Sequence, residues 1–398
     1  MRFNPSIHDF DRFVQQWGPE KEYILFGASP TCRDFLNFME QFLGFRLKIK
    51  CILDIDSKYQ GRCINPDDFG LETPPEGNGS MSFEVKPPEF LKEASGAQVI
   101  ITSDVYRRDI VEILDGMGFS WWKDFCSYRD IVGIWSLKHQ RKTVLWRSDL
   151  MITSRCTLRC KNCNMYIPYY KHPADIPLSN LINDVSLYFK AIDVVNIFHL
   201  VGGEPFLYSH LADLVTYIGE NHRDQICQFL LTSNGMVIPS DEVLAALSKY
   251  DVVVNISDYT SEISYKTRLE QVKELMTEKH VKHEVRPSLK WTDFGRPSQS
   301  LGLSTIRLMG HFDRCTATYR GLHEAKLYYC NLNCSAVAAG LFLDVDINYI
   351  DLGKNVVPED IVKFDLGFAP LGFITFCQYC NGCNTGVGNT IVAAAQLK

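Results

Sequence analysis

The sequence predicts an α/β protein with three domains, which span residues 1–135, 143–305 and 306–398. Short apolar runs, typical of buried parallel strands, alternate with segments of helical periodicity before the C-terminal region. The 14 cysteines are unevenly spaced, with four before residue 130, three at 156–163 and six between 315 and 383. A chain of 398 residues is long enough for two or three domains of roughly 100–200 residues each.

The composition excludes several classes of protein. Hydrophobic residues make up 46% of the chain and charged residues 22%, which is typical of a globular protein and not of a disordered or collagen-like one. The net charge is −6, from 41 Lys and Arg against 47 Asp and Glu, and the chain lacks a long basic run. We therefore expect no nucleic acid partner.

The N-terminal residues contain no apolar signal region, and no run of about 18 apolar residues occurs in the chain. We expect a cytoplasmic protein with no membrane partner. Because disulfides are disfavoured in a reducing compartment, we interpret the clustered cysteines first as metal ligands.

The first domain is predicted to be Rossmann-like. An apolar run at 23–26 ends in a Gly-Ala-Ser turn and leads into a helical pattern over 33–43. Further strands are expected at 51–53 and 98–102, and a second helix up to residue 114. This βαβ alternation favours a parallel sheet with helices on its faces.

The turn after the first strand leaves two interpretations open. Only Gly27 is present of the three glycines that a dinucleotide fingerprint requires, so the turn is either a plain βα corner or a pocket for a nucleotide or substrate. Asp54 either binds a ribose or simply ends the second strand. A Pro-, Gly- and Ser-rich loop is expected at 74–88 and a connecting segment at 131–141, and the residues expected to close the core are Trp121, Trp122 and Phe125.

The central domain is predicted from four apolar runs, at 150–152, 197–201, 229–231 and 252–256, with helical stretches between them. Each run ends in small or polar residues. In α/β folds the chemistry lies at the carboxyl ends of parallel strands, so these polar residues are candidates for a site.

Cys156, Cys160 and Cys163 lie within one short segment after the first of these strands and can converge on one centre. Three thiolates are one too few for a structural zinc site, whereas a soft sulfur set also suits an iron–sulfur cluster. A three-cysteine segment therefore either borrows a distant ligand or leaves one iron open for chemistry.

The segment 156–163, Cys-Thr-Leu-Arg-Cys-Lys-Asn-Cys, resembles the motif of radical S-adenosylmethionine (radical SAM) enzymes, and Gly202-Gly203-Glu204 resembles the GGE element of that family. The resemblance covers residues 144–287 and implies a partial (β/α)6-type barrel that holds a [4Fe-4S] cluster and S-adenosylmethionine. Asn162 departs from the bulky apolar residue that is frequent before the third cysteine, which leaves adenine contact to residues 165–167. The implied cofactor-binding residues are Gly202, Gly203, Glu204, Ser233, Asn234, Ser257 and Tyr166.

The C-terminal cysteines form a second sulfur-rich set. Cys315, Cys330, Cys377 and Cys380 supply four thiolates for one closed cluster, and zinc is the main rival occupant. After a radical SAM core, this arrangement resembles the small twitch domain, a relative of the SPASM domain, and implies one auxiliary [4Fe-4S] cluster. A hairpin over 321–329 would deliver one of these cysteines. Cys334 and Cys383 remain as substitute ligands, ligands of a second auxiliary cluster, or buried small residues.

The resemblance implies an oxidoreductase that cleaves S-adenosylmethionine reductively and abstracts a hydrogen atom from a small substrate. We expect oxidation or epimerisation of a sugar, an aminocyclitol or a nucleotide-linked sugar, with the auxiliary cluster as electron acceptor. A peptide-modifying maturase and a non-catalytic metal-binding scaffold are the alternatives. An electron donor such as flavodoxin or ferredoxin is the expected protein partner. No catalytic base is assigned among the candidates His199, Tyr166, Arg286, Asp293 and Arg307.

Overall fold

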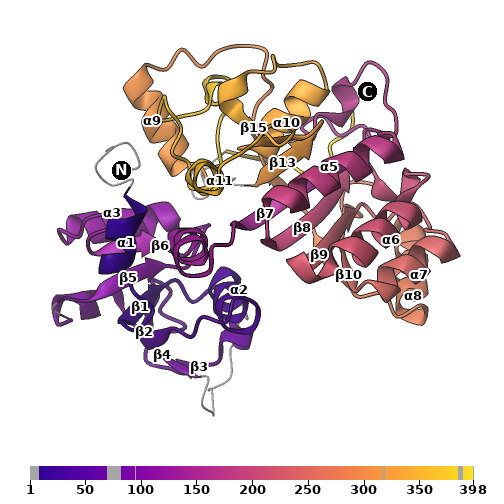
Figure 1. The fold of residues 1–398 in the computed structure, drawn as a ribbon. Helices are drawn as coiled ribbons and strands as arrows, with labels where there is room; N and C mark the ends of the chain where they lie inside the picture. The colour runs from indigo at the N-terminus through magenta and orange to yellow at the C-terminus, as the bar shows by residue number, and fades with distance from the viewer. Residues whose placement is uncertain (1–8, 70–81, 95, 317–318, 384–388, 398) are drawn as a thin grey trace. The chain divides into compact units, whose positions relative to one another are not determined.

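The computed structural model of the chain describes residues 9–69, 82–94, 96–316, 319–383 and 389–397. The chain forms two compact units, residues 1–142 and 143–398 (Figure 1). The second unit contains both the barrel and the C-terminal region that the sequence predicts, and a boundary between them near residue 305 stays a prediction.

The N-terminal unit is built on a six-stranded sheet with the order β3-β4-β2-β1-β5-β6. All neighbouring strands are parallel except β3 and β4. The predicted strands are present, and the predicted α/β class is correct. The strands are β1 (Glu22–Phe26), β2 (Lys48–Leu53), β3 (Cys63–Ile64), β4 (Phe83–Lys86), β5 (Gln98–Ile101) and β6 (Phe125–Ser127), and the helices are α1 (Phe10–Gln16), α2 (Pro30–Asn37), α3 (Arg107–Gly116) and α4 (Tyr128–Asp130).

Helix α2 begins earlier than the periodicity predicts. Ser29 caps it by accepting a hydrogen bond from the Cys32 amide, and Pro30 occupies its first position, where a missing N–H costs nothing. The helix continues through a π-helical turn, Phe38–Phe42. Residues 83–86 of the expected loop form β4 instead, and residues 74–81 of that loop lie outside the described residues.

The expected connecting segment 131–141 is also more regular than predicted. Residues Ile131–Gln140 form a wide π-helical segment whose first six residues are buried. The Trp135 indole donates a hydrogen bond to the Trp17 carbonyl over 2.9 Å, and the Trp17 indole donates to the Trp122 carbonyl over 2.7 Å. This indole chain ties α1 and the segment after α4 into the core, which explains why the segment is ordered and buried.

The second unit is built on an eight-stranded sheet with the order β11-β10-β9-β8-β7-β13-β14-β15. The strands from β11 to β13 in this order are mutually parallel, and β14 and β15 are added antiparallel. Strands β13 and β14 form the predicted hairpin. The strands are β7 (Val144–Thr153), β8 (Val194–Gly202), β9 (Ile226–Ser233), β10 (Val252–Asp258), β11 (His283–Pro287), β12 (Lys290–Thr292), β13 (Arg320–His323), β14 (Lys326–Tyr328), β15 (Tyr349–Asp351) and β16 (Thr390–Val392).

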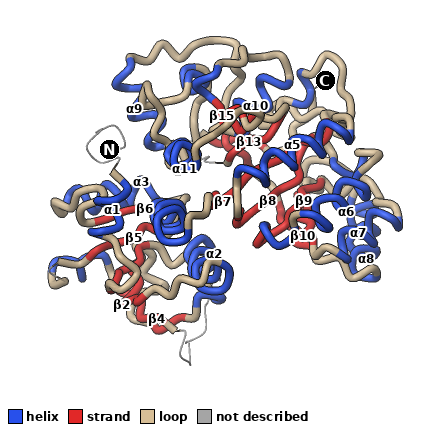
Figure 2. The backbone as a smooth tube through the Cα atoms, in the orientation of Figure 1, coloured by secondary structure: helices blue, strands red, loops and turns tan. Residues whose placement is uncertain are grey.

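Helices α5 to α8 accompany the parallel strands (Figures 1 and 2). Alternate residues of these strands, such as Leu150, Phe198 and Phe229, belong to one apolar cluster with the helices. The residues between them, such as Asp149 and His199, point to the opposite face, because successive side chains of a strand alternate in direction. The helices of this unit are α5 (Leu178–Ala191), α6 (Leu211–Asn221), α7 (Asp241–Lys249), α8 (Lys266–Glu278), α9 (Thr305–Arg314), α10 (Asn331–Ala338) and α11 (Pro358–Asp365).

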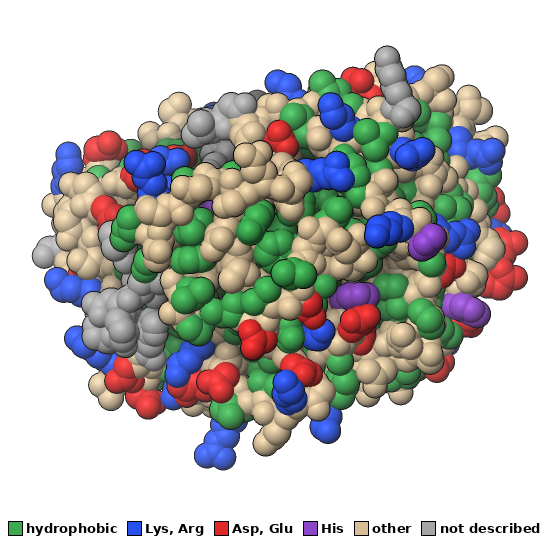
Figure 3. Space-filling view, turned by 90° about the horizontal axis from the view of Figure 1, so that it is seen from above, with side chains coloured by type: hydrophobic (Ala, Val, Ile, Leu, Met, Phe, Trp, Pro, Cys, Tyr) green, Lys and Arg blue, Asp and Glu red, His purple; other side chains and the backbone are tan. Residues whose placement is uncertain are grey.

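None of the described helices combines the length and the apolar composition that crossing a bilayer requires. On the face drawn in Figure 3, basic and acidic side chains are interspersed.

Candidate active site

The cysteine segment follows β7 directly and forms one wall of a cavity. Cys156, Cys160 and Cys163 line this cavity, whose volume is about 280 Å³, and all three are free thiols. Burial raises the pKa of Cys156 to about 12 and that of Cys160 and Cys163 to about 11. These thiols would therefore lose their protons and become thiolates only when they bind a cation.

Two glycines after β8 let the turn approach the cysteine segment. Gly202 and Gly203 line the same cavity, and the Gly203 amide donates to the Thr153 carbonyl over 2.8 Å. A Cβ atom on Gly203 would lie 2.0 Å from the Arg155 carbonyl oxygen and 3.1 Å from the Cys156 Cβ. Glycine is therefore required because the two backbones are in contact.

Glu204 does not line the cavity, although a cofactor contact was expected of it. It is fully buried, and its carboxylate accepts hydrogen bonds from the Ser233 hydroxyl and the Asn234 amide, both over 2.8 Å, and from the Phe206 amide over 3.1 Å. Burial raises its pKa to about 7. Glu204 thus holds the turn after β8 against the turn after β9, and its contact with the cofactor stays a prediction.

The other predicted residues divide into two groups. Ser233, Asn234 and Ser257 line the cavity, and the Asn234 side-chain amide donates to Thr157 Oγ1 over 3.0 Å. Tyr166 does not line it, since its side chain is buried in the protein and its hydroxyl has no hydrogen-bond partner among the described residues. Of the three residues considered for adenine contact, Met165 alone is part of the wall.

Three aromatic residues of the wall were not predicted, namely Tyr259, Trp291 and Tyr319. Tyr259 and Trp291 pack edge to face, with ring centroids 5.5 Å apart and an interplanar angle of 87°. Tyr259 follows the last residue of β10, so its position shortly after a predicted strand could have indicated that it lies at the site. Trp291 lies in β12, which pairs with β16 about 100 residues later, and nothing local in the sequence indicates that pairing.

The innermost part of the cavity is charged. Arg147 Nε donates to Asp149 Oδ1 over 2.8 Å, Arg147 Nη2 lies 2.6 Å from His199 Nδ1, and His199 Nε2 lies 2.8 Å from the Thr232 hydroxyl. Because a guanidinium only donates, His199 Nδ1 accepts and Nε2 carries the proton. All these residues line the cavity, as does Asn331, whose amide donates to Asp149 Oδ2 over 2.8 Å.

The protonation of this polar group follows from its surroundings. Burial, and then the neighbouring Arg147, lowers the pKa of His199, which keeps the imidazole neutral. Burial alone would raise the pKa of Asp149, but Arg147 and His199 hold it at about 2. The cavity therefore presents a fixed guanidinium, a fixed carboxylate and a neutral imidazole to whatever binds there.

The comparisons with known proteins address this region. The model of the Radical SAM superfamily matches residues 150–278, which contain the cysteine segment and the strands β8 to β10. This part of the chain is a radical SAM domain. No curated protein sequence matches the chain.

Several solved radical SAM structures are similar to this chain at low identity. anSMEcpe with bound AdoMet and a Cp18Cys peptide is 12% identical, with a TM-score of 0.39, over 61% of this chain and 91% of its own. BtrN in complex with AdoMet and 2-DOIA is 13% identical, with a TM-score of 0.37, over 61% of this chain and 93% of its own. SuiB from Streptococcus suis, bound to its precursor peptide SuiA, is 16% identical, with a TM-score of 0.29, over 40% of this chain and 36% of its own.

The radical SAM domain implies a [4Fe-4S] cluster and S-adenosylmethionine, and the residues present fit both. Three free thiols share one wall of the cavity, and the two glycines and the Ser and Asn side chains form the rest of its rim. No group of three or more His, Cys, Asp or Glu side chains in the described part of the chain is arranged to hold a single metal ion. A cluster distributes its cysteine ligands over several irons, so these thiols need not converge on one point.

A segment near residue 396 completes the cysteine wall of the radical SAM domain. The Lys161 amide donates to the Ala395 carbonyl over 2.7 Å, and the Leu397 amide donates to the Arg159 carbonyl over 2.8 Å. The Gln396 side chain accepts from the Arg159 amide over 2.8 Å and donates to Cys160 Sγ over 3.3 Å. A residue 236 positions away thus provides a hydrogen-bond donor to a predicted cluster ligand.

The C-terminal cysteines gather at a different place. Cys315, Cys330, Cys377 and Cys380 line one small cavity together with apolar side chains of α9 and of the segment before residue 380. Cys334 and Cys383 do not line it. Cys334 packs instead against β13, where a Cβ on Gly321 would lie 2.5 Å from the Cys334 Cβ.

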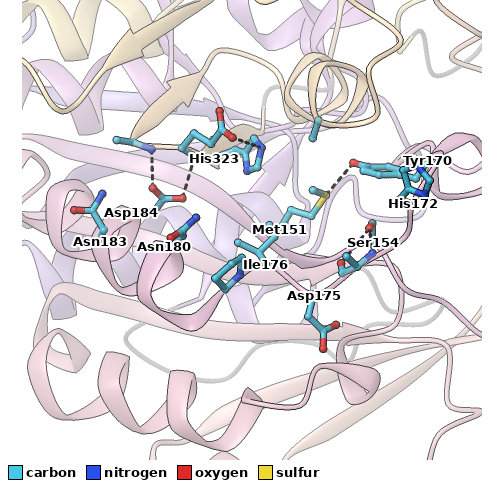
Figure 4. A pocket seen from close by; sticks show the side chains of 15 residues that line it. Met151, Ser154, Tyr170, His172, Asp175, Ile176, Asn180, Asn183, Asp184 and His323 are labelled. Atoms are coloured by element: carbon cyan, nitrogen blue, oxygen red, sulfur yellow. Dashed lines mark hydrogen bonds and ion pairs between the residues drawn. The ribbon is translucent and has the colours of Figure 1, made fainter.

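A larger cavity, about 530 Å³ in volume, is lined by the side chains drawn in Figure 4. It lies close to the cavity of the cysteine segment, which we call the radical SAM cavity. Met151 lines the larger cavity and belongs to the same apolar cluster as Met165, which lines the radical SAM cavity. The Tyr170 hydroxyl lies 3.4 Å from the Met151 sulfur. The remaining wall is mixed: Ile176 and Pro177 are apolar, and the polar side chains are those of His172, Asp175, Asn180, Asn183, Asp184 and His323.

Proposed function

We propose that this radical SAM enzyme dehydrogenates or epimerises a small hydroxylated substrate, such as a sugar or an aminocyclitol. The observation that carries the proposal is the charged group Arg147, Asp149 and His199 inside the cavity of the cysteine segment. Arg147 is partly exposed to the cavity and pairs with the buried Asp149, and a substrate hydroxyl group could accept a hydrogen bond from its guanidinium. The Arg147 guanidinium lies over the Tyr319 ring, with Arg147 Cζ 3.9 Å from the ring centroid, and this contact holds Arg147 in place.

The cysteines Cys156, Cys160 and Cys163 would hold the [4Fe-4S] cluster, and the rim residues Gly202, Gly203, Ser233, Asn234 and Ser257 would hold S-adenosylmethionine. Together these cofactors supply a 5′-deoxyadenosyl radical that removes a hydrogen atom from substrate carbon. The four C-terminal cysteines would hold an auxiliary [4Fe-4S] cluster, whose use in a dehydrogenation is to accept the one remaining electron.

The residues of the chain must handle the hydroxyl proton that an alcohol loses when it becomes a carbonyl. In our proposal the neutral His199 takes it at Nδ1, which becomes able to accept a proton when Arg147 Nη2, 2.6 Å away, turns to the substrate oxygen. The proton on Nδ1 would then face Asp149 Oδ1, 3.4 Å away. Arg147 would orient the substrate oxygen. The surrounding apolar wall, with Met165 and Trp291, would exclude water from the substrate radical.

The test begins with anaerobic reconstitution of the full chain and with iron and sulfide counts. We expect about eight irons per chain, falling to about four when Cys156, Cys160 and Cys163 are replaced by Ala, with loss of 5′-deoxyadenosine formation. Zinc at the C-terminal cysteines would remove the auxiliary-cluster part of the proposal. Absence of 5′-deoxyadenosine from the loaded wild type would indicate the non-catalytic scaffold instead.

Substrate class is tested with a panel of carbon-deuterated sugars and aminocyclitols. Transfer of deuterium into 5′-deoxyadenosine identifies the abstracted position, and His199→Gln is expected to reduce product formation more than abstraction. If His199→Gln leaves the ratio of carbonyl product to 5′-deoxyadenosine unchanged, the proton-accepting role is wrong.

A peptide-modifying function is the second candidate, and the larger cavity of Figure 4 favours it. That cavity is rimmed by exposed residues such as His172 and Asn180, and Met151 and Met165 separate it from the radical SAM cavity. A longer substrate could extend along it if the flexible Met151 side chain moved aside. Deuterium transfer from a peptide and from no sugar would establish this alternative.

A further inference from the structure

The N-terminal unit has its own cavity, about 450 Å³ in volume, and its position in the sheet is informative. Strand β1 lies between β2 and β5 in the sheet. The strand that follows β1 in the sequence is therefore added on one side of it, and β5 is added later on the other side. In open parallel sheets, ligands bind outside the carboxyl ends of the strands at such a reversal of strand order. The cavity lies there, lined by residues that follow β1, β2 and β5.

A carboxylate is held rigidly in this cavity. Asp54 directly follows β2 and is only 9% exposed. It accepts hydrogen bonds from the Ala28 amide over 2.6 Å and from the Asp56 amide over 2.8 Å, one on each oxygen. Each carboxylate oxygen has a second lone pair. Two adjacent acceptors in fixed positions match the two hydroxyl groups of a vicinal diol.

The phosphate-binding feature of dinucleotide folds is missing from the same turn. There, free backbone amides of the glycine turn and the helix start face the phosphates. Here the Ala28 amide is bonded to Asp54, the Ser29 amide to the Gly27 carbonyl over 3.0 Å, and the Cys32 amide to Ser29. A negative carboxylate thus takes part of the place that a phosphate would need. The Lys58 ammonium, which also lines the cavity, lies 3.5 Å from Asp56 Oδ2 and is already paired with a carboxylate, so this turn disfavours an anion.

The rim of the cavity is apolar on two sides. Ile55, which follows Asp54, is 40% exposed, and Tyr106, which follows β5, is 52% exposed. Both line the cavity and rank among the exposed large hydrophobic side chains of the described chain. Exposed aromatic and aliphatic side chains around a concave site are suited to enclose a flat ring.

From this arrangement we infer that the N-terminal unit binds a nucleoside or the nucleoside end of a larger molecule, with the ribose diol on Asp54 and the base beside Ile55 and Tyr106. The phosphate groups of such a molecule would not lie on the turn after β1. This site lies entirely within residues 1–142 and is independent of the proposed radical chemistry.

The test is a ligand-observed NMR titration of the full chain with adenosine and with uridine. Asp54 is a poor choice for substitution because it also holds two backbone amides. Tyr106→Ala removes a half-exposed ring, and Val105→Ala, next to it and 50% exposed but outside the cavity lining, is the matched control. Circular dichroism checks that both variants are folded.

We expect binding of at least one nucleoside to the wild type, weakened at least about fivefold by Tyr106→Ala and less than about twofold by Val105→Ala. The 2′,3′-dideoxy analogue should bind at least about tenfold more weakly, because Asp54 loses both hydroxyl donors. No binding, binding unaffected by Tyr106→Ala, or equal binding of the dideoxy analogue would each overturn the inference. A nucleoside diphosphate that binds more than about tenfold tighter than its nucleoside would overturn the exclusion of phosphate.

Discussion

The hydrogen bond from Gln396 to Cys160 predicts a measurable effect on the cluster of the radical SAM domain. A donor to a ligating sulfur stabilises the more negative, reduced form of a cluster, so Gln396→Ala should lower the reduction potential. The donor is well placed, because the amide oxygen is bonded to the Arg159 amide over 2.8 Å while the nitrogen lies 3.3 Å from the sulfur. A net contribution of about 0.5–1.5 kcal/mol corresponds to about 20–65 mV for one electron.

The assay is a potentiometric titration followed by electron paramagnetic resonance, with iron counted in each sample so that cluster loading is known. Gln396→Glu should lower the potential further, because it places a carboxylate beside the sulfur. Thr390→Ala, an exposed position of β16 in the same segment, is the control. A fully loaded Gln396→Ala protein whose potential stays within about 10 mV of wild type would refute the reasoning while leaving the cluster assignment intact.

Three further predictions concern stability and assembly. Gly203→Ala should reduce the iron content of the reconstituted protein and destabilise it by more than about 2 kcal/mol, since its Cβ would meet the Arg155 carbonyl oxygen, whereas Gly116→Ala, with open space around it, should not. Glu204 has a pKa of about 7 in the folded state against an ordinary value of 4.5. Below pH 4.5 it is protonated in both the folded and the unfolded state, whereas above pH 7 its ionisation lowers the free energy of unfolding by up to about 3 kcal/mol. Glu204→Gln should remove this loss of stability in urea titrations between those pH values. Asp365→Ala should cost about 3–5 kcal/mol in the same titrations, because it leaves the fully buried Arg320 guanidinium, 2.7 Å from Asp365 Oδ1 in the wild type, without its counter-charge.

The parts of the fold that local patterns determine were predictable. The apolar runs locate the strands β1, β2, β5 and β7 to β10, and the cysteine spacing with the following Gly-Gly-Glu indicates the radical SAM domain. The π-helical segment 131–140 was not predictable, because what orders it is a chain of indole hydrogen bonds to distant residues.

The site shows the same division between local and long-range information. Cys156 and Gly203 lie in a recognisable motif, and both line the cavity. Glu204 belongs to the same motif, yet it is not among the residues that line the cavity, because its buried carboxylate is hydrogen-bonded to Ser233 and Asn234. Arg147 lines the cavity because of the direction in which its side chain leaves β7, and Trp291 lines it because β12 pairs with β16. A single sequence indicates neither of these features.

The contact between Gln396 and Cys160 also bears on the order of events during synthesis. At about 5–20 residues per second, a ribosome needs roughly 10–50 s to add the 236 residues that separate the two positions. For that time the nascent cysteine segment exists without the C-terminal segment that later covers it. Proteins that deliver iron and sulfide would therefore meet an accessible acceptor during translation, and docking of residues 394–397 would then seal the loaded site.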